Sequence, residues 1–374
     1  MCDTVYAFFG IDPHHRPRRK LRRGVWSSTD AAWAERLVER YHQTTLPLLR
    51  VAAINCNKDT PCGGTDRPTR IPRTIHFIWL GEQPIPSHFK FEMDDKVGAD
   101  WSRCKDDTDI KPWNACMSSW LEHHPPSFDW TIRLWTETEV KSTFLDDTSE
   151  YTMTNRVTYE YALSKQNYGL ASDILRLELL SIFGGVYADI DYLCLAPLDD
   201  LHSAATFYCG ASNVGCVEIN NGLMASAAGH TVVQRMMKDI GNWFEDKIEQ
   251  EESETAPPAV AASAFLTSFL DAETTQSLNK AKELMHEDVI RHSGPGLITR
   301  VMIKVLADPR DAGDDENNAD IDRIMVLPAQ YFHSLPNDSR AAVAEYATVE
   351  RFCKEICGID MSRAVHLWGC SWQK

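Results

Sequence analysis

The sequence predicts an α/β fold, in which helices pack on a sheet, for the part of the 374-residue chain that follows about residue 70. Short β-like runs at 74–80, 130–135 and 186–191 alternate with helical patterns, and this alternation is typical of a sheet covered by helices. Hydrophobic residues make up 43% of the chain and aromatic residues 10%, which is enough for a large packed core.

The first 68 residues differ from the rest and are expected to form an N-terminal extension. Six arginine and lysine residues between positions 16 and 23 form a basic arm, and apolar periodicity predicts an amphipathic helix over 31–49. A solvated tail is the default interpretation of such an arm. A role at a membrane surface or in targeting is the alternative, so the sequence leaves membrane association open.

The best-specified helix of the chain precedes the third strand. Leucine and isoleucine residues recur at helical spacing over 170–180, and Gly184-Gly185 supplies a C-terminal stop. Asp173 and Arg176 lie three residues apart on this helix and therefore share a face. A surface ion pair is one interpretation of the two, and a shared functional cleft is the other.

The strand predicted at 186–191 ends in two aspartates. Alternation along a strand would put Tyr187, Asp189 and Asp191 on one face, at the carboxyl end where open α/β sheets bind ligands. Two neighbouring carboxylates repel unless a cation or a proton neutralises them, and Mg²⁺ or Mn²⁺ suits a few oxygen ligands and phosphate oxygens. The other two Asp-x-Asp triplets, at 107–109 and 320–322, lie in polar, charged stretches and are expected to be solvated.

Charge and composition restrict the partners and the compartment. A net charge of −16 disfavours general attraction to nucleic acid, so an anionic substrate would need a cation or a local basic pocket. No run approaches about 18 apolar residues and the start lacks a secretory signal core, so a soluble chain is expected. Two locations stay open: the cytoplasm, or the Golgi or secretory lumen if the N-terminus is incomplete.

Cysteines and polar stretches give two further expectations. Four cysteine pairs are close enough for small disulfide loops, with buried thiols as the alternative. They are Cys56/Cys62, Cys104/Cys116, Cys209/Cys216 and Cys353/Cys357. The polar stretches 249–258 and 310–320 are expected to be solvated surface loops.

Seven segments carry a resemblance to a known family. They are IPRTIHFIWLG (71–81), SWLEHHPPSFDWTIRLW (119–135), ASDILRLELLSIFGGVYADIDYLCLAPLDDL (171–201), INNGLMASAAGH (219–230), SGPGLIT (293–299), VLPAQYFHSLPND (326–338) and HLWGCSW (366–372). In this order they resemble the DXD sugar-binding glycosyltransferases of family 32, which include yeast initiating and sphingolipid mannosyltransferases and the glucosylating domains of clostridial toxins. The resemblance implies a GT-A catalytic domain over 69–374, with a Rossmann-like mixed sheet flanked by helices and some helical additions.

The resemblance also implies a reaction and its cofactor. The expected enzyme is retaining and moves a hexose from GDP-mannose or a UDP-hexose to a glycan, lipid or protein. Mn²⁺, or Mg²⁺, would bridge the donor diphosphate to Asp189 and Asp191, with His366 as the third ligand. Asp173 and Arg176 match the pair that contacts the transferred sugar.

Further residues are expected to bind the substrate. Ile78 and Trp79 resemble the platform for the nucleotide base. Asn221, or Asn220 after a shift of one position, resembles a polar residue near the donor sugar. Tyr187 shares the predicted face of the aspartates. Ser371 and Trp372 match a C-terminal pair that closes over the diphosphate.

Two other functions compete with a glycosyltransferase. A haloacid-dehalogenase-like phosphohydrolase also has an apolar strand that ends in Asp-x-Asp, but Tyr192 stands where that motif requires threonine or valine. A sugar-nucleotide-binding protein without turnover would keep the same acidic residues.

Overall fold

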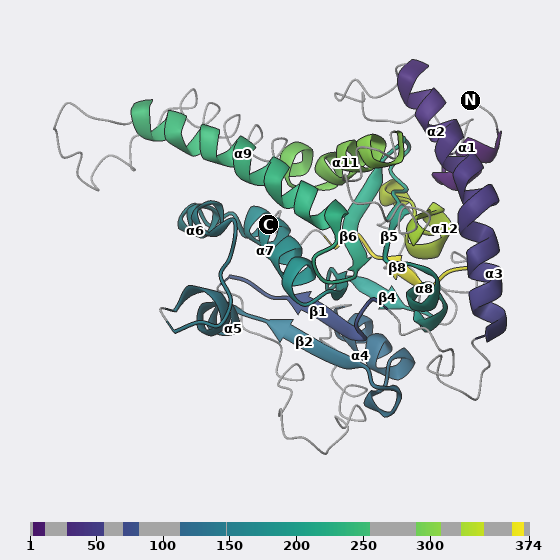
Figure 1. The fold of residues 1–374 in the computed structure, drawn as a ribbon, viewed down its shortest axis with the longest axis horizontal. Helices are drawn as coiled ribbons and strands as arrows, with labels where there is room; N and C mark the ends of the chain where they lie inside the picture. The colour runs from purple at the N-terminus through teal and green to yellow at the C-terminus, as the bar shows by residue number, and fades with distance from the viewer. Residues whose placement is uncertain are drawn as a thin grey trace.

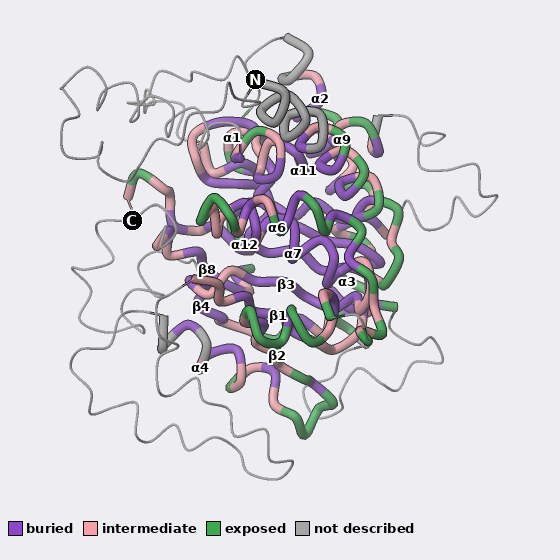
Figure 2. Tube along the Cα trace, turned by 90° about the vertical axis from the view of Figure 1, so that its left-hand side faces the viewer, coloured by how far each residue is buried: buried purple, intermediate pink, exposed green. Residues whose placement is uncertain are grey.

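The structure is a computed structural model in which a central sheet is flanked by helices (Figure 1). It describes residues 3–11, 28–55, 70–81, 113–146, 148–254, 289–307, 323–339 and 361–369. The buried part of the chain runs through the strands and α7, while exposed residues line the outer helices (Figure 2).

Six strands form a mixed sheet in the order β2-β1-β3-β6-β5-β7. Their bounds are β1 Thr74–Ile78, β2 Thr131–Trp135, β3 Gly185–Ala188, β5 Phe207–Ala211, β6 Ile219–Ser226 and β7 Ile324–Leu327. β1 pairs in parallel with β2 and β3, and β7 pairs in parallel with β5. β6 runs antiparallel between β3 and β5. The predicted α/β class, a mixed sheet flanked by helices, is therefore confirmed, as are the strands expected near 74–80 and 130–135.

A second, two-stranded sheet lies beside the first. It pairs β4 (Tyr192–Cys194) with β8 (Ala364–His366) in antiparallel register, with Tyr192 opposite His366. The residues that closely follow β3 in the sequence therefore pair with a segment near the C-terminus.

Helix α7 (Tyr168–Ile182) is the predicted helix and ends as expected. The Asn167 side chain caps its start by accepting the N–H of Leu170 at 3.0 Å. Gly184 follows the last turn with φ +63°, a left-handed conformation that glycine adopts without strain. An added Cβ there would also lie 2.7 Å from the backbone nitrogen of Ala228, so a side chain has no room.

The remaining helices cover the sheet. Their bounds are α4 Trp113–His123, α5 Glu137–Val140, α6 Arg156–Ser164, α8 Asp199–Ala204, α9 Thr231–Glu254, α11 Pro295–Ala307 and α12 Ala329–Phe332. Short helical turns lie at Pro126–Phe128 and Lys141–Leu145. Helices α7 and α11 both contact β6, and α9 packs against these two helices (Figure 1).

The N-terminal helices pack on the same body. α1 (Asp3–Phe8) precedes a continuous helical path of α2 (Ser28–Arg40), a π-helical turn (Tyr41–Thr45) and α3 (Leu46–Asn55), which confirms the helix expected over 31–49. Their buried side chains belong to the same hydrophobic cluster as the strands. The domain boundary expected near residue 68 stays a prediction, and the basic arm lies outside the described residues.

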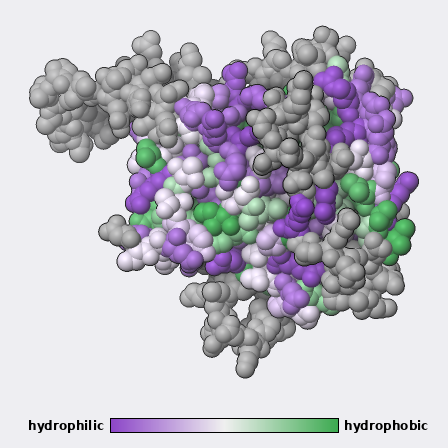
Figure 3. Space-filling view, viewed as in Figure 1, coloured by the Kyte–Doolittle hydropathy of each residue, from purple (hydrophilic) through white to green (hydrophobic). Residues whose placement is uncertain are grey.

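Apolar surface is exposed along α3 (Figure 3). Its exposed large apolar side chains are Val51 and Ile54, at 58% and 78%. Among the described helices, none combines the length and the apolar character needed to cross a bilayer.

Two sequence predictions about local structure are corrected. The strand expected over 186–191 ends at Ala188, because the backbone turns there: Tyr192 N–H donates to the carbonyl of Asp189 at 3.1 Å. The two aspartates therefore lie on a turn and not along one strand face. The loop expected over 249–258 is helical as far as Glu254, since α9 continues to that residue; the loop expected over 310–320 lies outside the described residues.

The cysteines that the structure describes follow the buried-thiol alternative. Cys209 and Cys116 carry free, fully buried thiols, so neither closes its predicted disulfide loop. The pairs Cys56/Cys62 and Cys353/Cys357 lie outside the described residues.

Candidate active site

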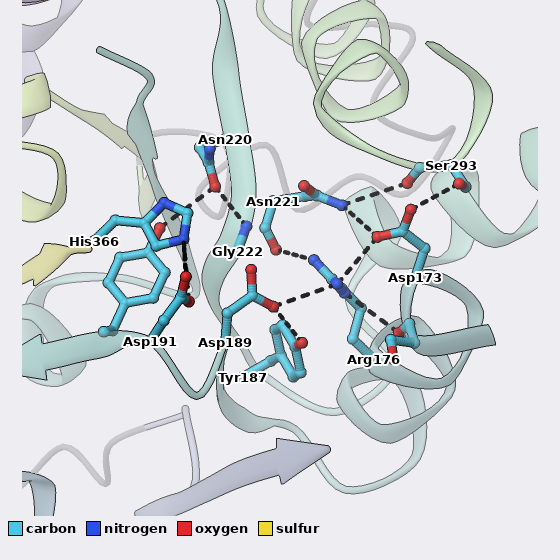
Figure 4. A network of polar contacts seen from close by, with 12 residues as sticks. Asp173, Arg176, Tyr187, Asp189, Asp191, Asn220, Asn221, Gly222, Ser293 and His366 are labelled. Carbon is cyan, nitrogen blue, oxygen red and sulfur yellow. Dashed lines mark hydrogen bonds and ion pairs between the residues drawn. The ribbon is translucent and has the colours of Figure 1, made fainter. Parts of the chain in front are cut away.

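The candidate site lies where β3 ends. Helix α7, the turn between β3 and β4, strand β6 and strand β8 all contribute side chains to it (Figure 4). The turn is held against the sheet by the Asp189 N–H, which donates to the carbonyl of Gly222 at 2.7 Å.

Arg176 is the centre of the first half of the site. Its guanidinium lies 3.1 Å from Asp173 Oδ1 and 3.4 Å from Asp189 Oδ1, and it donates to the Asn221 carbonyl at 2.8 Å. The same group lies 4.4 Å from the centre of the Tyr187 ring. Arg176 and Asp173 are each only 6% exposed, so this is a buried pair and not the surface ion pair that the helix spacing also allowed. Burial acts to lower the pKa of Arg176, but the combined effect of Tyr187 and the two aspartates is larger and raises it. The guanidinium therefore stays charged.

Asp173 has hydrogen-bond partners on both oxygens. Asn221 Nδ2 donates to Oδ1 at 2.9 Å, and the Ser293 hydroxyl donates to Oδ2 at 2.7 Å. Burial raises the pKa of Asp173, against the lowering effect of the Arg176 charge and of the hydrogen bond from Ser293. Ser293 is a site residue that the sequence reasoning missed, although its segment, SGPGLIT, was among those that carry the resemblance.

Asp189 is held from three sides. The Tyr187 hydroxyl donates to Oδ1 at 2.5 Å, and Arg176 lies beside the same oxygen. Oδ2 lies against Gly222, where a Cβ would come within 2.6 Å of it. The position of the Asp189 carboxylate therefore depends on Tyr187, on Arg176 and on the absence of a side chain at Gly222.

Asp191 and His366 form the second half of the site. His366 Nε2 lies 3.1 Å from Asp191 Oδ1 and 3.1 Å from Oδ2, and Gly369 N–H donates to Oδ2 at 2.7 Å. Burial acts to raise the pKa of Asp191, but the His366 charge and these hydrogen bonds hold it below its usual range. Burial likewise acts to lower the pKa of His366, and the negative charge of Asp191 raises it overall. Both shifts favour the charged forms, so each side chain stabilises the charge of the other.

These residues fit a divalent cation. Among the described residues, one ligand atom each from Asp189, Asp191 and His366 lie within 4.8 Å of one another. Two carboxylate oxygens and an imidazole nitrogen suit Mn²⁺, and Mg²⁺ less well because it prefers an all-oxygen set. Three protein ligands also leave coordination positions for water or phosphate oxygens.

The two candidate asparagines take different places. The Asn221 side chain donates to Asp173, and its backbone carbonyl accepts from the Arg176 guanidinium. Asn220 instead accepts the Gly222 N–H at 2.7 Å (Figure 4) and the Tyr192 hydroxyl at 3.4 Å. Asn221 thus lies on the Asp173 side of the site and Asn220 on the Tyr192 side. Which of the two lies near the donor sugar stays a prediction.

The residues expected to bind the nucleotide are only partly described. Ile78 ends β1, the parallel neighbour of β3, and its side chain is 7% exposed in the core. Trp79 follows it and is half-buried, and its backbone N–H donates to the Trp135 carbonyl at 2.9 Å. Their role as a base platform stays a prediction. Ser371 and Trp372 lie outside the described residues.

Comparison with known proteins supports the resemblance. Residues 111–208, which include Asp173, Arg176, Asp189 and Asp191, match the family described as "Glycosyltransferase sugar-binding region containing DXD motif". The resemblance to DXD sugar-binding glycosyltransferases is thereby confirmed over this region.

Individual relatives are distant. "Inositol phosphoceramide mannosyltransferase 1" of Schizosaccharomyces pombe is 29% identical over 138 residues, which is 37% of this chain and 33% of that protein. "Subversion of eukaryotic traffic protein A" of Legionella pneumophila is 25% identical over 177 residues, 46% of this chain and 25% of that protein. The matches therefore span a third or less of these relatives' own lengths. Among solved structures, "PaToxG Glycosyltransferase" overlaps 73% of this chain and 82% of its own, with 12% identity and a TM-score of 0.37.

Proposed function

We propose that this chain, which carries a glycosyltransferase sugar-binding DXD region, is a metal-dependent glycosyltransferase that moves a hexose from a nucleoside-diphosphate sugar to an acceptor. One observation carries the proposal: Asp189, Asp191 and His366 converge within 4.8 Å beside the buried Asp173–Arg176 pair. A group of ligands for a cation thus lies directly next to polar side chains that can hold a sugar.

The proposed donor is GDP-mannose, with a UDP-hexose as the alternative. Support comes from the names of relatives, among them inositol phosphoceramide mannosyltransferases and "Mannosyl phosphorylinositol ceramide synthase SUR1" of Saccharomyces cerevisiae. The same names favour a lipid acceptor over a glycan or a protein.

Asp189, Asp191 and His366 would hold the cation in this proposal. A bound Mn²⁺ or Mg²⁺ would stabilise the negative charge that develops on the departing diphosphate. Arg176 adds a fixed positive charge beside Asp189, where it balances the carboxylates and favours an anionic leaving group. Because Arg176 is buried and fixed by four neighbours, it needs little reorganisation during the reaction.

Asp173 is proposed to orient the sugar, with Asn221 and Ser293 fixing its carboxylate. Both of its oxygens already accept hydrogen bonds, at 2.9 and 2.7 Å. Such bonds weaken a carboxylate as a nucleophile, so they favour a retaining front-face transfer over a double displacement through Asp173. Mass-spectrometric detection of a glycosyl-Asp173 adduct would contradict the front-face route. Product anomers identified by NMR would test retention itself.

A donor panel tests the function. Nucleoside diphosphate release is measured from GDP-mannose, UDP-glucose, UDP-galactose and UDP-N-acetylglucosamine, with Mn²⁺ and with EDTA. The native chain is compared with Asp191→Ala and with Asp239→Ala, a control acid whose pairing with Lys304 is loose, at 3.9 Å. We expect one donor to be hydrolysed only with metal, and only Asp191→Ala to abolish this, by at least about 100-fold.

Two results would point to the competing functions. Release of orthophosphate from simple phosphate esters would indicate a phosphohydrolase. Calorimetric binding of a donor and Mn²⁺ without any diphosphate release, also when candidate lipid acceptors are added, would indicate a sugar-nucleotide-binding protein.

A further inference from the structure

His366 lies on a strand that orients it weakly. β8 has three residues, and its only strand partner in the described part of the chain is β4. A two-stranded ribbon this short has little stability of its own. The direction of the His366 ring therefore depends on the side chains around it.

No second hydrogen bond fixes this ring. A metal-ligating histidine usually donates its other ring nitrogen to a carboxylate, a carbonyl or water, which sets its orientation. His366 Nδ1 is buried and has no hydrogen-bond partner among the described residues. The hydrogen bond between Nε2 and Asp191 leaves the ring free to turn about that contact, so packing must fix the plane of the ring.

The Tyr192 ring is in place to do so. It lies flat against the imidazole, with the ring centres 4.4 Å apart and the planes 6° from parallel. The two residues are also direct partners in the β4–β8 register. Since rotation of the imidazole would drive its edge into the tyrosine face, the stack restricts the ring to one plane.

Tyr192 is itself fixed by its hydroxyl. The oxygen lies 2.6 Å from His333 Nε2 and 3.4 Å from Asn220 Oδ1. If His333 Nε2–H donates to Tyr192 and the tyrosine donates to Asn220, each proton is used once. The chain ends at Gly222 N–H, which donates to the same Asn220 oxygen at 2.7 Å.

His333 is rigidly placed. It is fully buried. Its backbone N–H donates to the Ala329 carbonyl at 2.6 Å, and its backbone carbonyl accepts from Asn213 Nδ2 at 3.0 Å. Asn213 follows β5 of the six-stranded sheet, and Tyr192 lies on β4 of the two-stranded sheet. His333 therefore connects the two sheets through its contacts with both residues.

We propose that Tyr192 and His333 are positioning residues for His366: Tyr192 by stacking on the imidazole, and His333 by fixing the hydroxyl of Tyr192. Neither residue is assigned as a metal ligand. The inference rests on the proposed function in one respect, because the orientation of His366 matters for affinity only if the site holds a cation.

NMR of the metal-free protein tests the geometry alone. The ring protons of His366, assigned by comparison with His366→Gln, should be shifted upfield by the tyrosine ring current. Tyr192→Leu should reduce that shift but leave the part due to the Trp368 ring, whose centre lies 4.3 Å from that of the imidazole, while Tyr192→Phe should retain the shift in full. Random-coil shifts for His366 in the native protein would contradict the stack. An unchanged shift in Tyr192→Leu would also contradict the stack.

Mn²⁺ affinity tests the role. In electron paramagnetic resonance titrations without donor, Tyr192→Leu should weaken binding by about 10-fold or more, the range seen when the surroundings of a ligand are changed. Tyr159→Leu is the matched control, since it removes another fully buried tyrosine ring on α6, and it should leave affinity unchanged.

A double-mutant cycle covers the case in which Tyr192→Leu does not fold. Tyr192→Phe and His333→Phe each keep a ring and remove the hydrogen bond between these two side chains, and Tyr192→Phe also loses the bond to Asn220. The double variant should therefore bind Mn²⁺ no more weakly than Tyr192→Phe. Additive effects, or Tyr192 variants that bind Mn²⁺ as tightly as the native chain, would overturn the positioning role alone. A native chain that binds no Mn²⁺ would overturn the metal premise of the proposed function and this role with it.

Discussion

Gly222 lies between the two halves of the site (Figure 4). Its N–H donates to Asn220, and its carbonyl accepts the Asp189 N–H, each at 2.7 Å. A Cβ would lie 2.6 Å from Asp189 Oδ2 and 2.9 Å from Asn220 Oδ1. The glycine is required here by space alone, since its φ is not in the left-handed region.

We expect Gly222→Ala to displace the Asp189 carboxylate. Crowding of a packed position should lower the free energy of unfolding by about 1–3 kcal/mol and weaken Mn²⁺ binding at the same time. Urea denaturation and metal titration measure the two effects. Gly229→Ala is the control: it has φ +68° but nothing within 4 Å of the added Cβ, so it should destabilise without any change in Mn²⁺ affinity. Native affinity in Gly222→Ala would contradict the steric argument.

At the scale of helices, α7 links the site to α6. Glu178, two residues after Arg176 on α7, is buried, and its carboxylate accepts the N–H groups of Thr154 at 3.1 Å and Asn155 at 2.7 Å. Asn155 is the residue that precedes α6, so the carboxylate lies at the positive end of that helix. Burial raises the pKa of Glu178, and these hydrogen bonds offset part of that effect.

We expect Glu178→Gln to destabilise the fold. The amide has one acceptor oxygen in place of two, so one backbone N–H of the 154–155 pair faces an NH₂ group and loses its partner. The free energy of unfolding should fall by about 1–3 kcal/mol in urea titrations. Glu160→Gln removes the exposed partner of Arg156 and should change it by about 0–1 kcal/mol. Equal effects of the two changes would show that the buried carboxylate has no special role.

Across the whole molecule, buried neutral histidines connect stability to pH. In His124, Nδ1 lies 3.2 Å from the Trp120 carbonyl, and Nε2 accepts the Leu198 N–H at 3.0 Å, so both nitrogens are committed. Burial, helped by the nearby His202 and His123, lowers its pKa to about 3. His76 is similarly held, and burial lowers its pKa to about 4.

We expect the fold to weaken in mild acid. The unfolded chain takes up a proton at each histidine near pH 6.5, whereas the folded chain resists protonation until about pH 3–4. Stability is therefore complete above about pH 6.5 and declines as the pH falls, by about 1 kcal/mol per histidine at pH 5.5. Urea titrations at pH 7.5 and 5.5 measure the decline. His124→Phe should reduce the difference between the two pH values, and His42→Gln, at an exposed histidine, should not.

Several parts of the fold follow from signals within short stretches of chain. Apolar spacing predicts the helix at 168–182 and Gly184 its stop, and the strands β1 and β2 lie where short β-like runs predict them. An Asp-x-Asp pair after a buried strand likewise needs only its own neighbours to suggest a cation site. Such features are predictable because the interactions behind them join residues a few positions apart.

The arrangement of the site depends on contacts between distant residues. His366 meets Asp191 across 175 positions and Ser293 meets Asp173 across 120, and no local pattern encodes either contact. Spacing on a helix put Asp173 and Arg176 on one face, but packing by β6 and the segment before α11 decided that the pair is buried. The turn at Asp189 illustrates the same limit, because the aspartates converge through backbone bonds to β6 and β8 that a strand pattern does not contain. The kinds of side chain therefore indicate what chemistry the site can perform. The geometry of the site forms only when the sheet brings distant segments of the chain together.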